Sequence, residues 1–429
     1  MDVVNRRRYF LTCAAVGLSA GSPRWPQVSR REPRLLARSR VGYTAATTVN
    51  FGWTSEQQEL YEGSVSFARE RLNHTLAERE RAHQFGADEW RACAEFGLTG
   101  LCLPVTRGGM GLDCLTTTRV FEGFGCGCED AGLLMAAAAH LFACAAPIAH
   151  FGGEPLQRRY LAGLAAGTTI GANAITEAGA GSDVFALATR ATQVGDDYLL
   201  SGTKSYVTNG PVADLFLVYA MTEPAHGYLG VSAFAVPRAT AGLTLGPAID
   251  KIGLHTAPTC SLYLDDCRVS REHLVGDEGQ GAAVFGHSMQ WERTGLFASY
   301  LGAMERTLAR CVSYAKERRQ WGKPIAKQQA VAHRIADMKL RLESARLLLY
   351  QACWQFDQAR DATLETALAK LAVSEAAIES ALDAIRIHGG AGTMRDVGIE
   401  RGLRDAVPSA IFSGTSEMQR NIIARALGL

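Results

Sequence analysis

The chain has 429 residues, of which 47% are hydrophobic and 20% are charged, and its formal net charge is +1. This length is enough for two or three domains with a substantial core. Nine arginines against Asp2 and Glu32 give residues 1–40 a charge of +7, so the remaining residues carry −6. A mildly acidic body without a basic stripe argues against nucleic acid as the main partner.

Residues 1–50 form an extension that has no globular pattern. The stretch NRRRYFLTCAAVGLSAGS combines an arginine cluster, an apolar run and small residues, which is typical of a twin-arginine export signal. A mis-assigned start site is the alternative interpretation. The eleven scattered cysteines fit a reducing cytoplasm, where most of them would be small buried hydrophobes. We therefore expect a cytoplasmic protein, and the N-terminus leaves export open.

Helical patterns dominate residues 51–170 and predict an N-terminal helical domain. Within this domain, residues 131–151 carry no formal charge and reach the length of a membrane span. The alanine enrichment and the interruptions at His140, Pro147 and His150 instead favour a pair of buried helices. We therefore expect no membrane contact.

The pattern changes at residues 171–275 to short β-rich runs separated by Gly, Asn, Asp and Pro, which predict a small middle β-domain. From 276 to 429 the chain is helical again, and four long segments predict a C-terminal four-helix bundle. These segments span about 279–316, 325–357, 362–389 and 398–428. The expected fold is mostly α with a small central β-domain.

Three stretches contain residues suited to a flat cofactor that carries phosphate. NAITEAGAGSDV (173–184) offers hydroxyls and a Gly-rich turn whose backbone N–H groups can approach a ligand closely. In GTKSYVTNG (202–210), Tyr206 and Thr208 would share one strand face and suit a heterocycle. In KERRQWGKP (316–324), arginine forks suit a pyrophosphate, and Trp321 suits adenine. Taken alone, each stretch is equally typical of a connecting loop, a cross-strand pair or a solvated helix end.

In this order and at these distances, the three stretches resemble the acyl-CoA dehydrogenase family of flavoproteins. IRIHGGAGTMRD, GIERGLRDA and FSGTSEMQRNIIARAL complete the pattern, and the resemblance runs from about Thr54 to Leu429. It implies an N-terminal helical domain, a β-barrel-like middle domain and a C-terminal four-helix bundle. It also implies FAD, bound between the middle domain and the bundle of a homodimer or homotetramer, with a neighbouring subunit supplying part of the site. We expect no metal.

The resemblance assigns cofactor contacts residue by residue. The flavin contacts of the family match Ile175, Thr176, Ser182, Tyr206 and Thr208, and its adenosine pyrophosphate contacts match Arg318 and Trp321. The segment that reaches the partner subunit's FAD matches Arg386, Gly389 and Gly390. Further cofactor contacts match Thr415 and Glu417. Three positions depart from the usual pattern, because tryptophan is more usual at 206, glutamine is commoner at 386, and the family mostly has proline where this chain has Ala178.

The catalytic base raises a question, because the family usually has its glutamate at position 413 and this chain has Ser413. A serine hydroxyl is far too weak a base to remove an α-proton. In VFGHSMQWERTGLFASYLGAME (284–305), Glu292 falls within an apolar stripe, where burial would raise its pKa and make it a better base. The structural alternative is a buried glutamate paired with Arg293 or Arg306.

A minority of the family places its catalytic glutamate on this helix, in a Glu-Arg pair that Glu292 and Arg293 match. The resemblance therefore assigns Glu292 as the base and places Ser413 and Arg293 in the substrate pocket. It also implies that a flavin accepts the β-hydride.

SMQWERTGLFASYLGAMER and IFSGTSEMQ are most similar to the branch of the family that works in natural-product biosynthesis. Members of this branch oxidise L-prolyl groups held as thioesters on peptidyl carrier proteins. The predicted activity is FAD-dependent α,β-dehydrogenation of an acyl thioester, carried by a peptidyl carrier protein or by CoA, with an unspecified electron acceptor. The alternatives are an acyl-CoA dehydrogenase of short or branched substrates, a flavin monooxygenase on the same fold, and a non-catalytic flavoprotein.

Overall fold

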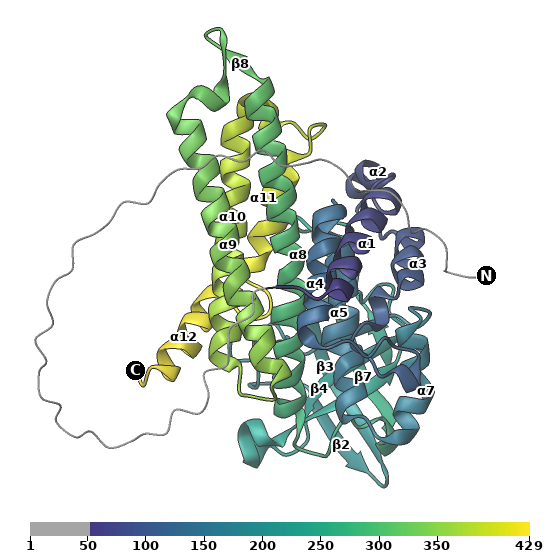
Figure 1. Cartoon of the computed structure of the whole chain (residues 1–429). Coiled ribbons are helices and arrows are strands. Elements are labelled where there is room, and N and C mark those ends of the chain that lie inside the picture. Colours follow the sequence, from purple (N-terminus) through teal and green to yellow (C-terminus); the bar gives the residue numbers. More distant parts are fainter. Residues whose placement is uncertain (1–51) are drawn as a thin grey trace, which may run out of the picture. The chain divides into compact units, whose positions relative to one another are not determined.

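The computed structural model describes residues 52–429, and Trp53–Leu429 form one compact unit. The N-terminal extension, with its twin-arginine-like stretch, lies outside the described residues. The elements follow the expected order of helices, then strands, then helices (Figure 1). The ten cysteines between residues 52 and 429 are all free, and eight of them are buried, as small hydrophobic residues are.

Seven α-helices form the N-terminal part. They are α1 (Ser55–Arg71), α2 (Leu76–Ala82), α3 (Ala87–Phe96), α4 (Cys114–Gly127), α5 (Ala131–His140), α6 (Ala146–Phe151) and α7 (Glu154–Ala165). Helices α5 and α6 are joined by five π-helical residues, Leu141–Ala145, so the predicted helix pair is one continuous helix. It is long and apolar enough to cross a membrane, but 94% of its most apolar window is buried inside the protein.

Buried His140 joins this apolar helix to its surroundings. Its Nε2 lies 3.0 Å from the Leu164 carbonyl oxygen, and its Nδ1 accepts a 2.9 Å hydrogen bond from the Gly171 N–H. Burial lowers the pKa of His140 to about 4, so the ring is neutral at pH 7. The histidine therefore acts as a satisfied core residue, and its helix lies directly against the start of the sheet.

The middle part is one curled sheet. Its strands are β1 (Gly171–Ala174), β2 (Arg190–Val194), β3 (Asp197–Thr208), β4 (Leu215–Met221), β5 (Val231–Pro237), β6 (Leu243–Leu245) and β7 (Thr259–Ser270). Their order is β1-β4-β2-β3-β7-β6, and β5 pairs with β4. The buried rings of Tyr198, Phe216 and Phe234 lie in its core.

The long strand β3 is bulged where it carries two of the predicted flavin contacts. Its pairing with β7 shifts register between Lys204 and Val207, and Tyr206 has a left-handed φ of 57°. Tyr206 is 67% exposed, Val207 is buried and Thr208 is half-buried. Tyr206 and Thr208 are therefore both more exposed than Val207 between them, although the bulge takes Tyr206 out of the regular pleat of the strand.

Five α-helices and a small hairpin form the C-terminal part. They are α8 (Gly281–Glu317), the hairpin β8 (Arg319–Gln320) and β9 (Lys323–Pro324), α9 (Gln329–Asp357), α10 (Thr363–His388), α11 (Ile399–Ala406) and α12 (Ser416–Ala426). The single helix predicted at 398–428 is wrong, because a turn separates α11 from α12. Pro408 cannot continue the helical hydrogen bonding, and Ser413 and Gly414 have φ of 55° and 88°.

Helices α4 and α8 cross closely because each has a glycine at the crossing. A Cβ at Gly302 would overlap the Glu122 carbonyl oxygen and the Cys126 nitrogen. Nearby, Arg306 donates a 2.6 Å hydrogen bond to the Cys128 carbonyl beyond the end of α4. Arg306, one of the two partners suggested for Glu292, is therefore engaged with α4.

Candidate active site

Glu292 lies on α8 with only 7% of its surface exposed, as its place in the apolar stripe predicts. Burial raises the pKa of its carboxyl, against the lowering effects of a hydrogen bond from Ser413 and of the Arg293 charge. The Ser413 hydroxyl donates directly to Glu292 Oε1. A buried carboxylate with a raised pKa has the properties of a general base that works near neutral pH.

Arg293 is engaged with the turn between α11 and α12, where its Nε donates a 2.8 Å hydrogen bond to the Ser413 carbonyl oxygen. Burial lowers the pKa of Arg293 to about 10, although the Glu292 charge opposes this shift. Within residues 52–429 no ion pair of 4.0 Å or less joins Glu292 to Arg293 or Arg306. The geometry therefore differs from the structural ion pair that the sequence left open.

Three parts of the chain meet around Glu292. The neighbouring Trp291 stacks on Phe142 of the π-helical segment, with ring centroids 5.9 Å apart. On the sheet side lies Tyr219 of β4, whose hydroxyl pKa is raised by burial and further by the Glu292 charge. The base candidate therefore sits where the N-terminal helices, the sheet and the bundle meet.

A buried ion pair closes the Gly-rich loop that begins at Thr176. The Lys204 ammonium lies 2.6 Å from Glu177 Oε1 and donates to the Ile175 carbonyl oxygen at 3.2 Å. The Glu177 carboxylate also accepts the backbone N–H groups of Ala188, at 2.7 Å, and Thr189, at 3.1 Å. Sequence reasoning missed this pair, although both residues lie within the quoted motifs TEAGAGSD and GTKSYVTNG.

The loop leaves room for a ligand beside predicted flavin contacts. A Cβ added at Gly179 or Gly181 would meet nothing within 4 Å. The Ser205 N–H donates a 2.8 Å hydrogen bond to the Thr176 carbonyl oxygen, which brings Thr176 beside the bulge at Tyr206. An exposed serine hydroxyl, open backbone and an exposed aromatic ring fit the flavin part of FAD.

Removing the Lys204 charge should loosen this loop. We expect Lys204→Met to leave the buried Glu177 carboxylate without its cation, at a cost of about 3 kcal/mol in the free energy of unfolding, and to weaken FAD retention. Thermal unfolding and the ratio of flavin to protein absorbance after gel filtration measure the two effects. The double variant Glu177→Gln with Lys204→Met should recover part of the stability. Full FAD retention in the single variant would contradict the assigned role of the pair.

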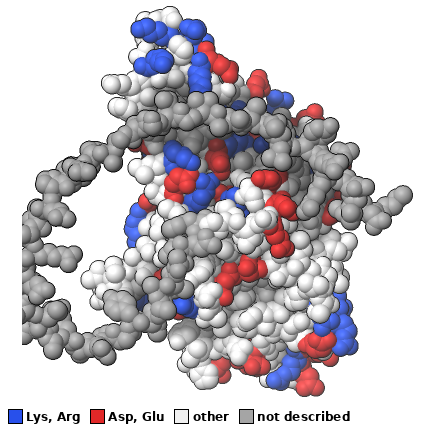
Figure 2. Space-filling view, viewed as in Figure 1, with Lys and Arg blue, Asp and Glu red and all other residues white. Residues whose placement is uncertain are grey.

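The other predicted cofactor residues of the bundle lie apart from this loop. Arg318 is the C-cap of α8, and Trp321 sits between β8 and β9 with 85% of its surface exposed. Figure 1 places β8 at the end of the bundle that points away from strands β3, β4 and β7. Figure 2 shows Lys and Arg side chains gathered at that same end. A basic end with an exposed tryptophan fits a pyrophosphate and an adenine.

The glycine pair lies at this same end of the bundle. Tyr314 of α8 stacks on His388, with ring centroids 4.3 Å apart, and its hydroxyl donates to the His388 carbonyl oxygen at 3.3 Å. Gly389 and Gly390 follow directly, and a Cβ at either would meet nothing within 4 Å. Arg386, one turn earlier, pairs with Asp383 at 3.3 Å.

Thr415 and Glu417 begin α12, next to the turn that carries Ser413. Thr415 is the N-cap residue, and its hydroxyl accepts the Met418 N–H at 3.2 Å. Glu417 follows in the first turn, where its side chain is mostly exposed. The chain thus places Ser413, Thr415 and Glu417 in one short segment opposite Glu292 of α8.

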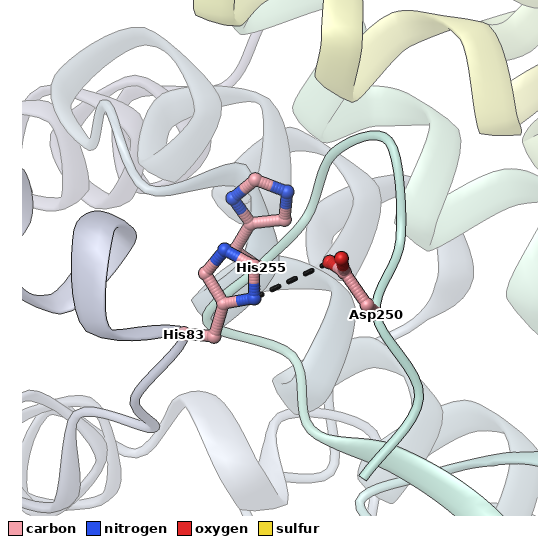
Figure 3. Close-up of side chains that lie close together, drawn as sticks. All are labelled: His83, Asp250 and His255. Atoms are coloured by element: carbon pink, nitrogen blue, oxygen red, sulfur yellow. Dashed lines mark ion pairs between the residues drawn. The ribbon is translucent and has the colours of Figure 1, made fainter.

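In the part of the chain that the structure describes, one group of side chains of the kinds that bind metal ions lies apart from Glu292 (Figure 3). His83 Nδ1 lies 3.4 Å from Asp250, and the rings of His83 and His255 stack with centroids 4.0 Å apart. Each of the three side chains offers one ligand atom, and these atoms lie within 4.8 Å of one another. His255 is also engaged, with Nδ1 3.2 Å from Glu80 and Nε2 2.7 Å from the Lys251 carbonyl oxygen. Both ring nitrogens of His255 therefore already have protein partners.

Comparison with known proteins gives three consecutive domain matches: acyl-CoA dehydrogenase N-terminal domain at residues 54–168, middle domain at 172–267 and C-terminal domain at 279–428. An L-prolyl–peptidyl-carrier-protein dehydrogenase of Pseudomonas fluorescens is 51% identical over 351 residues, which cover 82% of this chain and 92% of that protein. A protein of the same name from a Serratia species is 40% identical over 381 residues, which cover 89% and 99%.

Solved structures agree with these matches. The prolyl acyl carrier protein oxidase AnaB has a TM-score of 0.87 and 42% identity, covering 88% of this chain and all of that one. PigA, solved with FAD and proline, has a TM-score of 0.87 and 40% identity, covering 89% of this chain and all of that one. The chain therefore belongs to the acyl-CoA dehydrogenase family, and it is an FAD-dependent oxidoreductase that acts on thioesters.

Proposed function

We propose that this chain dehydrogenates an L-prolyl group held as a thioester on a peptidyl carrier protein in natural-product biosynthesis. The observation that carries the proposal is the buried Glu292 carboxylate, which accepts a hydrogen bond from Ser413 and whose pKa burial raises. Two relatives named for this reaction, 51% and 40% identical, support the choice of substrate. Carrier proteins work in the cytoplasm, so we propose the same location for this chain.

Glu292 performs the proton step in this proposal. Its carboxylate takes the α-proton of the thioester, and its raised pKa makes it a stronger base than an exposed glutamate. Ser413 donates a hydrogen bond to the carboxylate and orients it, and Arg293 holds the Ser413 carbonyl in place. Bound FAD supplies the hydride acceptor.

Residues of the sheet hold the flavin in this proposal. Ile175, Thr176 and Ser182 come from the loop that the Glu177–Lys204 pair closes, and Tyr206 and Thr208 come from the bulged strand β3. Thr415 and Glu417 add contacts from the start of α12.

We propose that a homo-oligomer completes the cofactor site. The Thr176 loop is hydrogen-bonded to β3, whereas Trp321 lies between β8 and β9. Figure 1 shows β8 at the end of the bundle that points away from β3, so one copy does not bring the two together. Helix α9 also has exposed apolar residues seven positions apart, at Leu340, Leu347 and Trp354, which form one stripe along the helix. Such a stripe favours contact with another helix, as between copies of this chain.

The test is anaerobic mixing of the purified flavoprotein with L-prolyl carrier protein while flavin absorbance is followed. We expect bleaching, together with a mass loss of about 2 or 4 Da on the tethered acyl group, because hydrogens leave in pairs. Bleaching by a short acyl-CoA and not by the prolyl thioester would instead indicate a metabolic acyl-CoA dehydrogenase. In a separate aerobic assay with reduced flavin, oxygen incorporation into the product would indicate a monooxygenase.

A further inference from the structure

Lys370 is a fully buried lysine on α10, with 0% of its surface exposed. Within residues 52–429 its Nζ has no hydrogen-bond partner. Taking an ammonium out of water without a partner is costly, so lysines are almost never fully buried unless they are paired. Burial of the Lys370 ammonium therefore does not stabilise the fold, and the reason for it must lie in the groups around it.

The ammonium lies beside the elements that carry the proposed base and its hydrogen-bond donor. Its Nζ is 5.4 Å from the ring centroid of Phe297, which lies five residues after Glu292 on α8. Phe297 in turn packs against Phe412, with centroids 5.7 Å apart, and Phe412 directly precedes Ser413. Lys370 is therefore linked by two aromatic contacts to the turn that holds Ser413.

The charged groups around Lys370 shift its pKa in opposite directions. Burial lowers the pKa of Lys370 to about 8, and the Arg293 charge on α8 lowers it as well. Glu417 on α12 and Glu375 on α10 raise it. Lys370 is therefore mostly charged at pH 7. The turn beyond Phe412 is held to α8 by the 2.8 Å hydrogen bond from Arg293 to the Ser413 carbonyl oxygen.

We propose that Lys370 is a positioning residue of the reaction, acting through Phe297 and Phe412. Its ammonium holds the Phe297 ring, and the Phe297–Phe412 contact holds the turn from which Ser413 donates to Glu292 and favours the ionised form of that carboxylate. The inference rests on the proposed role of Glu292 as the base. It assigns a task to a residue that the resemblance to the family did not single out.

The test uses Lys370→Met in the purified flavoprotein, because methionine has a similar length and no charge. The rate of flavin reduction by L-prolyl carrier protein is measured against pH, together with thermal unfolding. Reduction needs ionised Glu292, so its rate rises with pH through the Glu292 pKa. We expect the variant to shift this acid limb upward by roughly one pH unit, because the turn loses its support and the Ser413 hydrogen bond that lowers the Glu292 pKa is weakened.

Lys370→Met should impair flavin reduction but should not lower the stability of the fold. The pKa of Lys370 is lower in the folded protein, about 8, than its ordinary value of 10.5, so the folded state bears the cost of the buried charge below pH 8. That cost disappears as the pH rises from 8 towards 10.5. Lys370→Met should therefore keep FAD and unfold at the same or a higher temperature than the wild type, with the largest gain below pH 8.

The outcomes for Lys370→Met distinguish a positioning role from a structural one. A folded Lys370→Met with an unshifted acid limb overturns the proposal, and so does a variant that unfolds or loses FAD, because Lys370 would then be a structural residue. Lys339→Met is the matched control, since Lys339 is exposed on α9 and pairs with Glu343 at 2.5 Å; it should leave both measurements unchanged. Wild-type rates in Glu292→Gln would show that the base assignment has failed, which is a separate result.

Discussion

Glu292→Gln is expected to slow flavin reduction by substrate roughly 10²–10⁴-fold while FAD stays bound. The amide keeps the size of the side chain and can still accept the Ser413 hydrogen bond, but it has no basic oxygen. The pKa of Glu292 is raised in the folded state, so stability falls as the pH rises from the ordinary value through the raised one. At pH 8 the uncharged variant should therefore unfold at the same or a higher temperature than the wild type.

Anaerobic stopped-flow absorbance and thermal unfolding separate the two effects. Ser413→Ala is a useful companion, because it removes the hydrogen bond that lowers the Glu292 pKa but keeps the carboxylate. This variant should reduce the rate less than Glu292→Gln does and should move the acid limb to higher pH. Unchanged turnover in Glu292→Gln would place the base on another residue.

Gly302→Ala is expected to destabilise the fold by about 3 kcal/mol or more, although alanine is normally the better helix former. The new Cβ would overlap backbone atoms of Glu122 and Cys126 on α4, and backbone cannot move aside as a side-chain tip can. Chemical denaturation with far-UV circular dichroism measures the change in the free energy of unfolding.

Gly286→Ala is the matched control on the same helix. A Cβ at Gly286 meets nothing within 4 Å, so this variant should be neutral or stabilised by up to about 1 kcal/mol. Equal effects of the two substitutions would contradict the close α4–α8 crossing.

Patterns within single segments predicted much of this fold. The helical period predicted α8, α9 and α10 to within a few residues, because long amphipathic segments carry a strong signal. The bounds of strands β1, β2 and β6 could not be predicted, since three to five residues are too few to show a period. The break between α11 and α12 was missed because apolar residues continue on both sides of Pro408.

Those features of the site that lie within a single sequence motif were predictable. Burial of Glu292 followed from its place in an apolar stripe. The Glu177–Lys204 pair and the placement of Lys370 beside Phe297 join residues 27 and 73 positions apart, and only tertiary packing brings them together. The bulge at Tyr206 was also hidden, because its left-handed backbone is set by pairing with β7.

The contact between Ser413 and Glu292 bears on how such enzymes diverge. Since the hydroxyl of residue 413 touches the carboxylate of residue 292, a glutamate at 413 would place its own carboxylate in the same small space. An ancestor with carboxylates at both positions would have had to share one proton between them, because two adjacent negative charges disfavour each other. Under the proposed role of Glu292, classifying relatives by the residue at 413 alone would overlook a base carried at 292.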